Sequence, residues 1–93
     1  MKGNKQEGFK SRFLEVLELP KDIVLDLPRI TVTGKIGVFI ENHKGIMEYS
    51  SEQVRINTSL GLVVIKGQDL VIKYVVADEI FVEGKIEAIE FEE

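Results

Sequence analysis

The side chains that could carry out acid–base or metal chemistry are few and scattered in this 93-residue chain. His43 is the single histidine, so no histidine pair within one chain can bind a metal ion. Asp22 and Asp26 lie four residues apart, a spacing that would place two carboxylates on one helical face for acid–base work. We interpret both carboxylates as solvated or capping groups, and His43 as a structural residue of a turn.

Other reactive arrangements are missing from the sequence. The chain has no cysteine, which excludes disulfides, thiolate metal sites and cysteine nucleophiles. It has no glycine-rich phosphate loop with its lysine, and its serines have no partner base in view. Asn57-Thr-Ser59 matches a glycosylation sequon, but it lies where a turn is expected and no secretion signal is recognised. We therefore expect a protein that is not an enzyme and that needs no cofactor or metal.

Short apolar alternations cut by turn residues make up the chain from Arg29 to Phe91. Gly34, Gly67 and Gly84 each follow β-branched residues at −4 and −2, and a new apolar stretch follows each glycine. Period-two patterning around a glycine predicts a strand, a tight turn and a second strand. About eight short strands are predicted, at residues 29–33, 36–41, 45–49, 53–57, 61–66, 70–76, 79–83 and 86–91.

The connections between these predicted strands are short, as at Gly34-Lys35, Gly67-Gln68-Asp69 and Gly84-Lys85. Short connections favour antiparallel neighbours, because a parallel crossover needs a dozen or more residues. The simplest architecture is an all-β antiparallel meander that forms a small sandwich or barrel. A short β-solenoid stays open as an alternative, because the spacing of the three glycines is close to multiples of 17 residues.

Two of the predicted strands are apolar on both faces. Residues 62–65 read Leu-Val-Val-Ile, and residues 70–76 contain the pairs Val71-Ile72 and Val75-Val76. A strand that is buried on both faces has such a continuous apolar run. We interpret these segments as central strands or as strands that another subunit covers. The acidic residues of the C-terminal run are interpreted instead as protection against unwanted edge pairing.

The first residues form a separate region in this interpretation. Residues 1–8 are predicted to be a flexible basic tail, and residues 9–93 a single β domain with an N-terminal helix. Phe9, Phe13 and Val16 recur at helical spacing, and Pro20 cannot continue that helix. We expect the short amphipathic helix to cover an open end or a face of the sheet.

Charge is unevenly distributed along the chain. Residues 1–35 hold seven basic and five acidic side chains, whereas residues 36–93 hold five basic and eleven acidic ones. The acidic sheet is a poor partner for nucleic acid, which needs a basic face. No segment has the roughly 18–20 consecutive apolar residues of a spanning helix, and Lys10 and Arg12 interrupt any signal-peptide core. We expect a cytoplasmic protein without a transmembrane segment.

Several separated blocks of this sequence have a family likeness. The blocks are residues 18–31, Ile40-Glu-Asn-His-Lys-Gly-Ile46, 54–58, 65–70 and Val82-Glu-Gly-Lys-Ile-Glu-Ala-Ile-Glu-Phe91. From Phe9 onward the chain resembles the YabP/YqfC family of sporulation proteins, and it is more similar to the YqfC branch. The resemblance implies a protein made in the mother cell of an endospore-forming bacterium. It also implies a membrane-protein partner at the outer forespore membrane, and it supplies no catalytic motif.

The leading hypothesis is a non-enzymatic sporulation factor that acts by protein–protein contact. Edge or face pairing would join it to a membrane protein, to further copies of itself, or to both. We predict partner contacts in the exposed residues of the most polar sizeable loop. That loop consists of Glu41, Asn42, His43 and Lys44.

Two other functions stay open at this point. The first is a membrane-surface adaptor held by the basic amphipathic start of the chain, which contains Lys2, Lys5, Lys10 and Arg12. The second is a small-ligand-binding β domain, which would need a sizeable interior cavity. The many bulky Ile, Val and Leu residues predicted to face inward argue against such a cavity.

Overall fold

A computed structural model describes residues 26–93, which form one antiparallel sheet of six strands. The strands are β1 (Arg29–Thr33), β2 (Gly37–Glu41), β3 (Gly45–Tyr49), β4 (Gln53–Thr58), β5 (Gly61–Val76) and β6 (Glu79–Glu92). Their order across the sheet is β1-β2-β6-β5-β4-β3. The predicted tail at 1–8 and the predicted helix that follows it lie outside the described residues.

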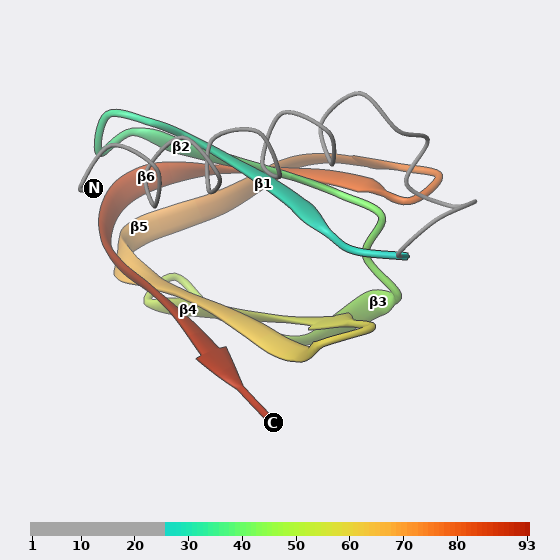
Figure 1. The fold of residues 1–93 in the computed structure, drawn as a ribbon. Coiled ribbons are helices and arrows are strands. Elements are labelled where there is room, and N and C mark those ends of the chain that lie inside the picture. Colours follow the sequence, from blue (N-terminus) through green and yellow to red (C-terminus); the bar gives the residue numbers. More distant parts are fainter. Residues whose placement is uncertain (1–25) are drawn as a thin grey trace, which may run out of the picture.

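The sheet folds over on itself because its two longest strands, β5 and β6, pass through both layers (Figure 1). In the upper layer the first half of β6 pairs with β2 on one side and with the second half of β5 on the other. In the lower layer the second half of β6 pairs with the first half of β5, which pairs in turn with β4. β1 and β3 lie at the two ends of the strand order, so the sheet is not closed.

The all-β antiparallel class is confirmed, but the predicted strand count and meander differ from the structure. The predicted strands 61–66 and 70–76 are continuous as β5, and the predicted strands 79–83 and 86–91 are continuous as β6. β2 pairs with β6 instead of β3, which breaks the simple meander. The β-solenoid alternative is wrong, because every strand pair in residues 26–93 is antiparallel.

Glycine has two different roles in this sheet. Gly34 lies in a hairpin turn between β1 and β2, as predicted, with a left-handed φ of +52°. Gly67 and Gly84 lie instead inside β5 and β6, where the register between the two strands shifts and the sheet bends. A β-carbon on Gly67 would come within 2.0 Å of the Lys85 carbonyl oxygen. Because the strands approach so closely, the bend can form only without a side chain at Gly67.

Carbonyl groups of two hairpin turns accept hydrogen bonds from backbone N–H groups of β5 and β6 at the bend. The Gly84 N–H donates to the Ile36 carbonyl at 3.1 Å, in the turn between β1 and β2. On the other layer, the Leu70 N–H donates to the Ser51 carbonyl at 2.8 Å, in the turn between β3 and β4. These backbone N–H groups of β5 and β6 are therefore paired next to the bend, which stabilises it.

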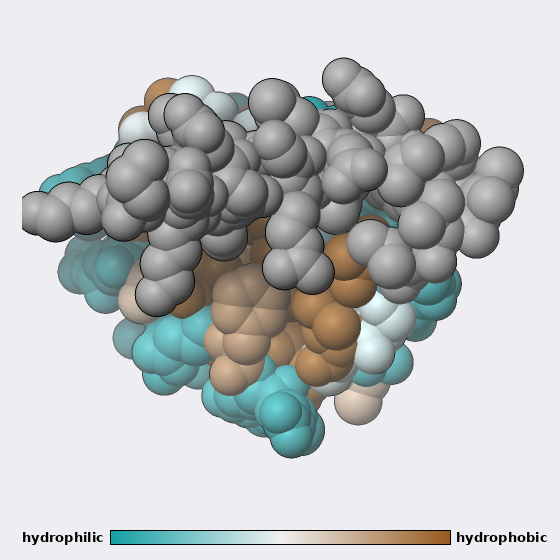
Figure 2. All heavy atoms as spheres, viewed as in Figure 1, coloured by the Kyte–Doolittle hydropathy of each residue, from teal (hydrophilic) through white to brown (hydrophobic). Residues whose placement is uncertain are grey.

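The core fills the space between the two layers. Alternate residues of β2, β4, β5 and β6 point inward and have essentially no exposed surface. Figure 2 shows apolar residues gathered where the space between the layers opens toward the viewer. The fully enclosed members are Val38, Ile40, Val54, Ile56, Val63, Ile65, Ile80 and Val82, with Leu70 and Ile86 at the bend. Within residues 26–93, no helix is long and apolar enough to cross a membrane.

Candidate functional site

The predicted contact loop carries the chain from the upper layer to the lower layer. Glu41 ends β2, Gly45 begins β3, and Asn42, His43 and Lys44 span the gap between them. The His43 N–H donates to the Asp78 carbonyl at 3.1 Å, and the Lys44 N–H donates to the Asn57 carbonyl at 2.7 Å. These two bonds tie the loop to the β5–β6 turn and to the end of β4.

The side chains of this loop divide into two buried groups and two that reach the surface. Asn42 and His43 are only 6% and 9% exposed. His43 Nδ1 accepts the Gly45 N–H at 2.9 Å, and Nε2 is buried with no hydrogen-bond partner. Lys44 is exposed, and Glu41 lies partly exposed 3.9 Å from the Arg29 guanidinium. Partner contact by this loop stays a prediction. Lys44 and Glu41 are its two residues whose side chains reach the surface.

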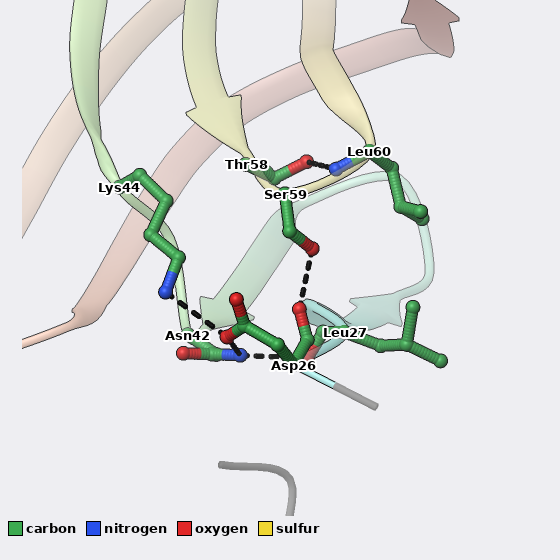
Figure 3. A network of polar contacts seen from close by, with 7 residues as sticks. All are labelled: Asp26, Leu27, Asn42, Lys44, Thr58, Ser59 and Leu60. Atoms are coloured by element: carbon green, nitrogen blue, oxygen red, sulfur yellow. Dashed lines mark hydrogen bonds and ion pairs between the residues drawn. The ribbon is translucent and has the colours of Figure 1, made fainter. Parts of the chain in front are cut away.

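A polar network centred on Asp26 holds this end of the molecule together (Figure 3). The Asp26 carboxylate accepts hydrogen bonds from Asn42 Nδ2 and from Lys44 Nζ, each at 3.0 Å. Asn42 Nδ2 also donates to the Leu27 carbonyl at 3.1 Å. The Ser59 hydroxyl donates to the Asp26 carbonyl, so the network joins the start of β1, the loop after β2 and the β4–β5 turn. These hydrogen bonds hold three segments of the fold together, and the described residues of the network include no pair of groups arranged for acid–base catalysis.

The network makes stability depend on the charge of Asp26. Hydrogen bonds from Asn42 and Lys44 lower the pKa of this carboxyl below its usual 3.8. The carboxylate therefore stabilises the fold fully above pH 3.8, and its contribution is lost as the pH falls through the lowered value. We expect Asp26→Asn to remove this acid-dependent loss, at the cost of a small decrease in Tm at neutral pH. Thermal unfolding of both proteins between pH 2.5 and 7 measures the effect, and identical pH profiles would contradict it.

The second half of β5 exposes several apolar side chains next to one another. We call residues Val71 to Val76 the β5 edge, because one side of this segment pairs with β6 and no described strand pairs with the other. Val71, Val75 and Val76 are 48%, 47% and 58% exposed. The edge begins immediately after Leu70, whose carbonyl accepts the Tyr49 hydroxyl at 3.1 Å. It thus combines unpaired backbone groups with apolar side chains on both faces.

Aromatic side chains extend this apolar surface across the outer face of the upper layer. Tyr74, on the β5 edge, has its ring centre 5.9 Å from that of Phe81 on β6. It also lies 6.4 Å from the ring centre of Phe39 on β2. The ring planes are tilted by 37° and 49°, and both centre-to-centre distances lie within the range of interacting aromatic pairs. The outer face is therefore an ordered apolar platform next to the unpaired edge.

A shallow hollow of 380 Å³ lies beside the platform, near the bend. It is lined by Thr33, Ile36, Gly37, Phe81, Glu83 and Gly84. The hollow exists because Gly37 has no side chain, and a β-carbon there would meet the Phe81 ring at 3.1 Å. It opens on the surface of the upper layer and is not the interior cavity that a ligand-binding barrel requires.

Two of the other edges of the described sheet have features that hinder pairing. The second half of β6 carries Glu87, Glu90 and Glu92. β3 has a register shift between Ile46 and Glu48, which interrupts a regular ladder. Charged side chains and bulges are the devices by which natural sheets protect their edges. The segment 70–76 is apolar on both faces, as predicted from the sequence, and it lies at an edge of the described sheet.

Comparison with known proteins identifies the family. A family model described as the YabP family matches residues 26–93, which is the part of the chain that folds into the bent sheet. The uncharacterized protein YqfC of Bacillus subtilis (strain 168) is 36% identical over 91 residues, covering 98% of each chain. No solved structure matches the chain significantly. The resemblance seen in the sequence is confirmed, and the chain belongs to the YabP family.

Proposed function

We propose that this protein is a non-enzymatic sporulation factor that works by contact with other protein chains. The β5 edge carries the proposal, because no strand within residues 26–93 pairs with its outer side and its valines are half exposed. Addition of a strand to such an edge is a common mode of protein recognition. Membership of the YabP family supports the link to sporulation, through the resemblance described above.

The proposed place of action is the mother-cell side of the outer forespore membrane. The chain would dock there as a subunit of a membrane protein, which the family resemblance implies. The aromatic platform next to the β5 edge is suited to this contact, because ordered aromatic and apolar side chains provide much of the binding energy of protein interfaces.

Deleting the gene in its own bacterium is expected to lower the number of heat-resistant spores without changing vegetative growth. The natural chain should restore spore counts. A variant with Val71→Ser and Val76→Ser should restore them less well, because it removes apolar contact from the β5 edge. Val32→Ser is the matched control, since Val32 is equally exposed at 48% but lies on β1. A deletion strain that forms normal numbers of spores would contradict the proposal.

Membrane docking through a protein partner can be separated from direct lipid binding. The chain is expected to pellet with forespore membranes and to stay in solution with protein-free anionic vesicles. Binding to such vesicles that disappears in high salt would favour the adaptor function instead. The variant that tests this lipid binding replaces four basic residues with glutamine. They are Lys2, Lys5, Lys10 and Arg12.

A further inference from the structure

The composition of the β5 edge conflicts with its position in a single copy of the chain. Residues on both of its faces are apolar, as in a central strand, yet among the described strands only β6 pairs with it. Three residues of the edge lie on the outer face: Val71 opposite Glu83, Tyr74 opposite Phe81, and Val76 opposite Glu79. Val75 lies on the core side, opposite Ile80. A strand of this kind becomes a central strand when a second strand of similar composition pairs with it.

From this conflict we infer that two copies of the chain pair through their β5 edges, in an antiparallel arrangement about a two-fold axis. Antiparallel pairing of identical strands is self-complementary, and it closes after two copies. The two upper layers then form one continuous sheet of eight strands, in the order β1-β2-β6-β5 followed by β5-β6-β2-β1. This inference deepens the proposed function, on which it rests, by naming one partner and the strand that contacts it.

Charge permits a second copy to pair at this edge. The chain has a net charge of −4, so two copies repel each other in general. Lys73 is the only charged residue between Val71 and Val76, and its ammonium lies 3.7 Å from the Glu83 carboxylate. The β5 edge therefore brings two copies together without an excess of negative charge.

The size of the contact sets its expected strength. The paired segment is six residues long, and the half-exposed valines and Tyr74 add to its buried area. Interfaces that bury less than about 1,200 Å² are weak or transient. We therefore expect a dimer whose population rises with protein concentration, with the monomer present at high dilution.

The test is the mass of the full chain by light scattering over a concentration series. The natural chain should approach twice the monomer mass of 10.5 kDa at high concentration. Val75→Lys places a charge on the core side of the edge, which natural sheets use to prevent pairing, and should keep the monomer mass throughout. The control is Val32→Lys, because Val32 is 48% exposed and faces the core from β1, opposite Val38. This control should dimerise like the natural chain.

A distance measurement identifies the paired strand independently of these variants. The chain has no cysteine, so Lys73→Cys and Thr31→Cys each introduce a single site for a spin label. Labels at Lys73 should lie close together across the two-fold axis. Labels at Thr31 should lie at opposite margins of the eight-stranded sheet, roughly 34 Å apart at about 4.8 Å per strand.

Three results would overturn the inference. They are a natural chain that stays monomeric at every concentration, a folded Val75→Lys variant that still dimerises, and a dimer in which the Thr31 labels are the closer pair. Val76→Lys provides a second variant at the same edge if Val75→Lys does not fold, as judged by circular dichroism. A monomeric natural chain that restores spore formation would overturn the dimer alone. If the chain dimerises but deletion of its gene leaves spore formation unchanged, the proposed function alone is overturned.

Discussion

Replacing Ile65 with aspartate is expected to abolish folding. Ile65 has no exposed surface and lies inside the core, between Val54 on β4 and Ile89 on β6. The change removes a buried side chain and places an unpaired carboxylate between the layers, which costs about 5 kcal/mol or more. Domains of this size are stable by about 5–15 kcal/mol, so the variant is expected to be largely unfolded. Circular dichroism and urea unfolding at neutral pH measure the effect.

Val64→Asp is the control, because Val64 is as fully buried as its neighbour but faces the other side of the sheet. It lies opposite Arg55 and Glu90 in the ladder, and Arg55 Nε is buried there without a hydrogen-bond partner. A carboxylate at position 64 is therefore close to a guanidinium N–H that can donate a hydrogen bond to it. We expect this variant to fold with a loss of about 2 kcal/mol. Equal stability of the two variants would show that the core does not lie on the Ile65 side.

The contrast between these neighbours shows what the sequence could predict about this fold. The run from 62 to 65 correctly indicated a strand that is buried on both faces, but the run alone does not distinguish Val64 from Ile65. The difference between them depends on Arg55, nine residues away on β4, and on the ladder that places it opposite Val64. Periodicity within one strand carries no information about the charge of its neighbour.

The continuity of β5 and β6 was beyond prediction for a similar reason. A glycine that follows alternating β-branched residues is compatible with a tight turn and with a bulged bend, because both need a residue without a side chain. At Gly34 the local pattern ends in a turn, whereas at Gly67 the strand continues. What separates the two is the distance from Gly67 to the Lys85 carbonyl, a contact between residues far apart in the sequence.

The candidate site was predictable only as a polar loop. Asn, His and Lys between two predicted strands are typical of an exposed turn, which is why partner contacts were expected from the exposed residues of this loop. The burial of Asn42 and His43 results from the crossover between layers, and their positions are fixed by Asp26 and Asp78. By contrast, the apolar composition of residues 70–76 was visible in the sequence. Its position at an edge required the strand order.

Replacing Gly67 with alanine is expected to destabilise the protein by at least about 3 kcal/mol, because the bend cannot accommodate a side chain there. The added β-carbon would lie 2.0 Å from the Lys85 carbonyl oxygen and 3.0 Å from its carbon, which are backbone atoms that cannot rotate away. Relief requires β5 and β6 to separate at the bend. That separation would also disturb the hydrogen bond from the Gly67 N–H to the Glu52 carbonyl, at 3.0 Å. Urea unfolding followed by circular dichroism measures the loss.

Gly34→Ala separates this steric effect from the conformational preference of glycine. Gly34 has a φ of +52°, but a β-carbon there would have no atom within 4 Å. Its replacement should therefore cost only the strain of a left-handed alanine, about 1–2 kcal/mol. A Gly67→Ala variant as stable as Gly34→Ala would mean that β5 and β6 do not approach each other at the bend. In that case the eight short strands expected from the sequence would describe the chain better than two long strands that pass through both layers.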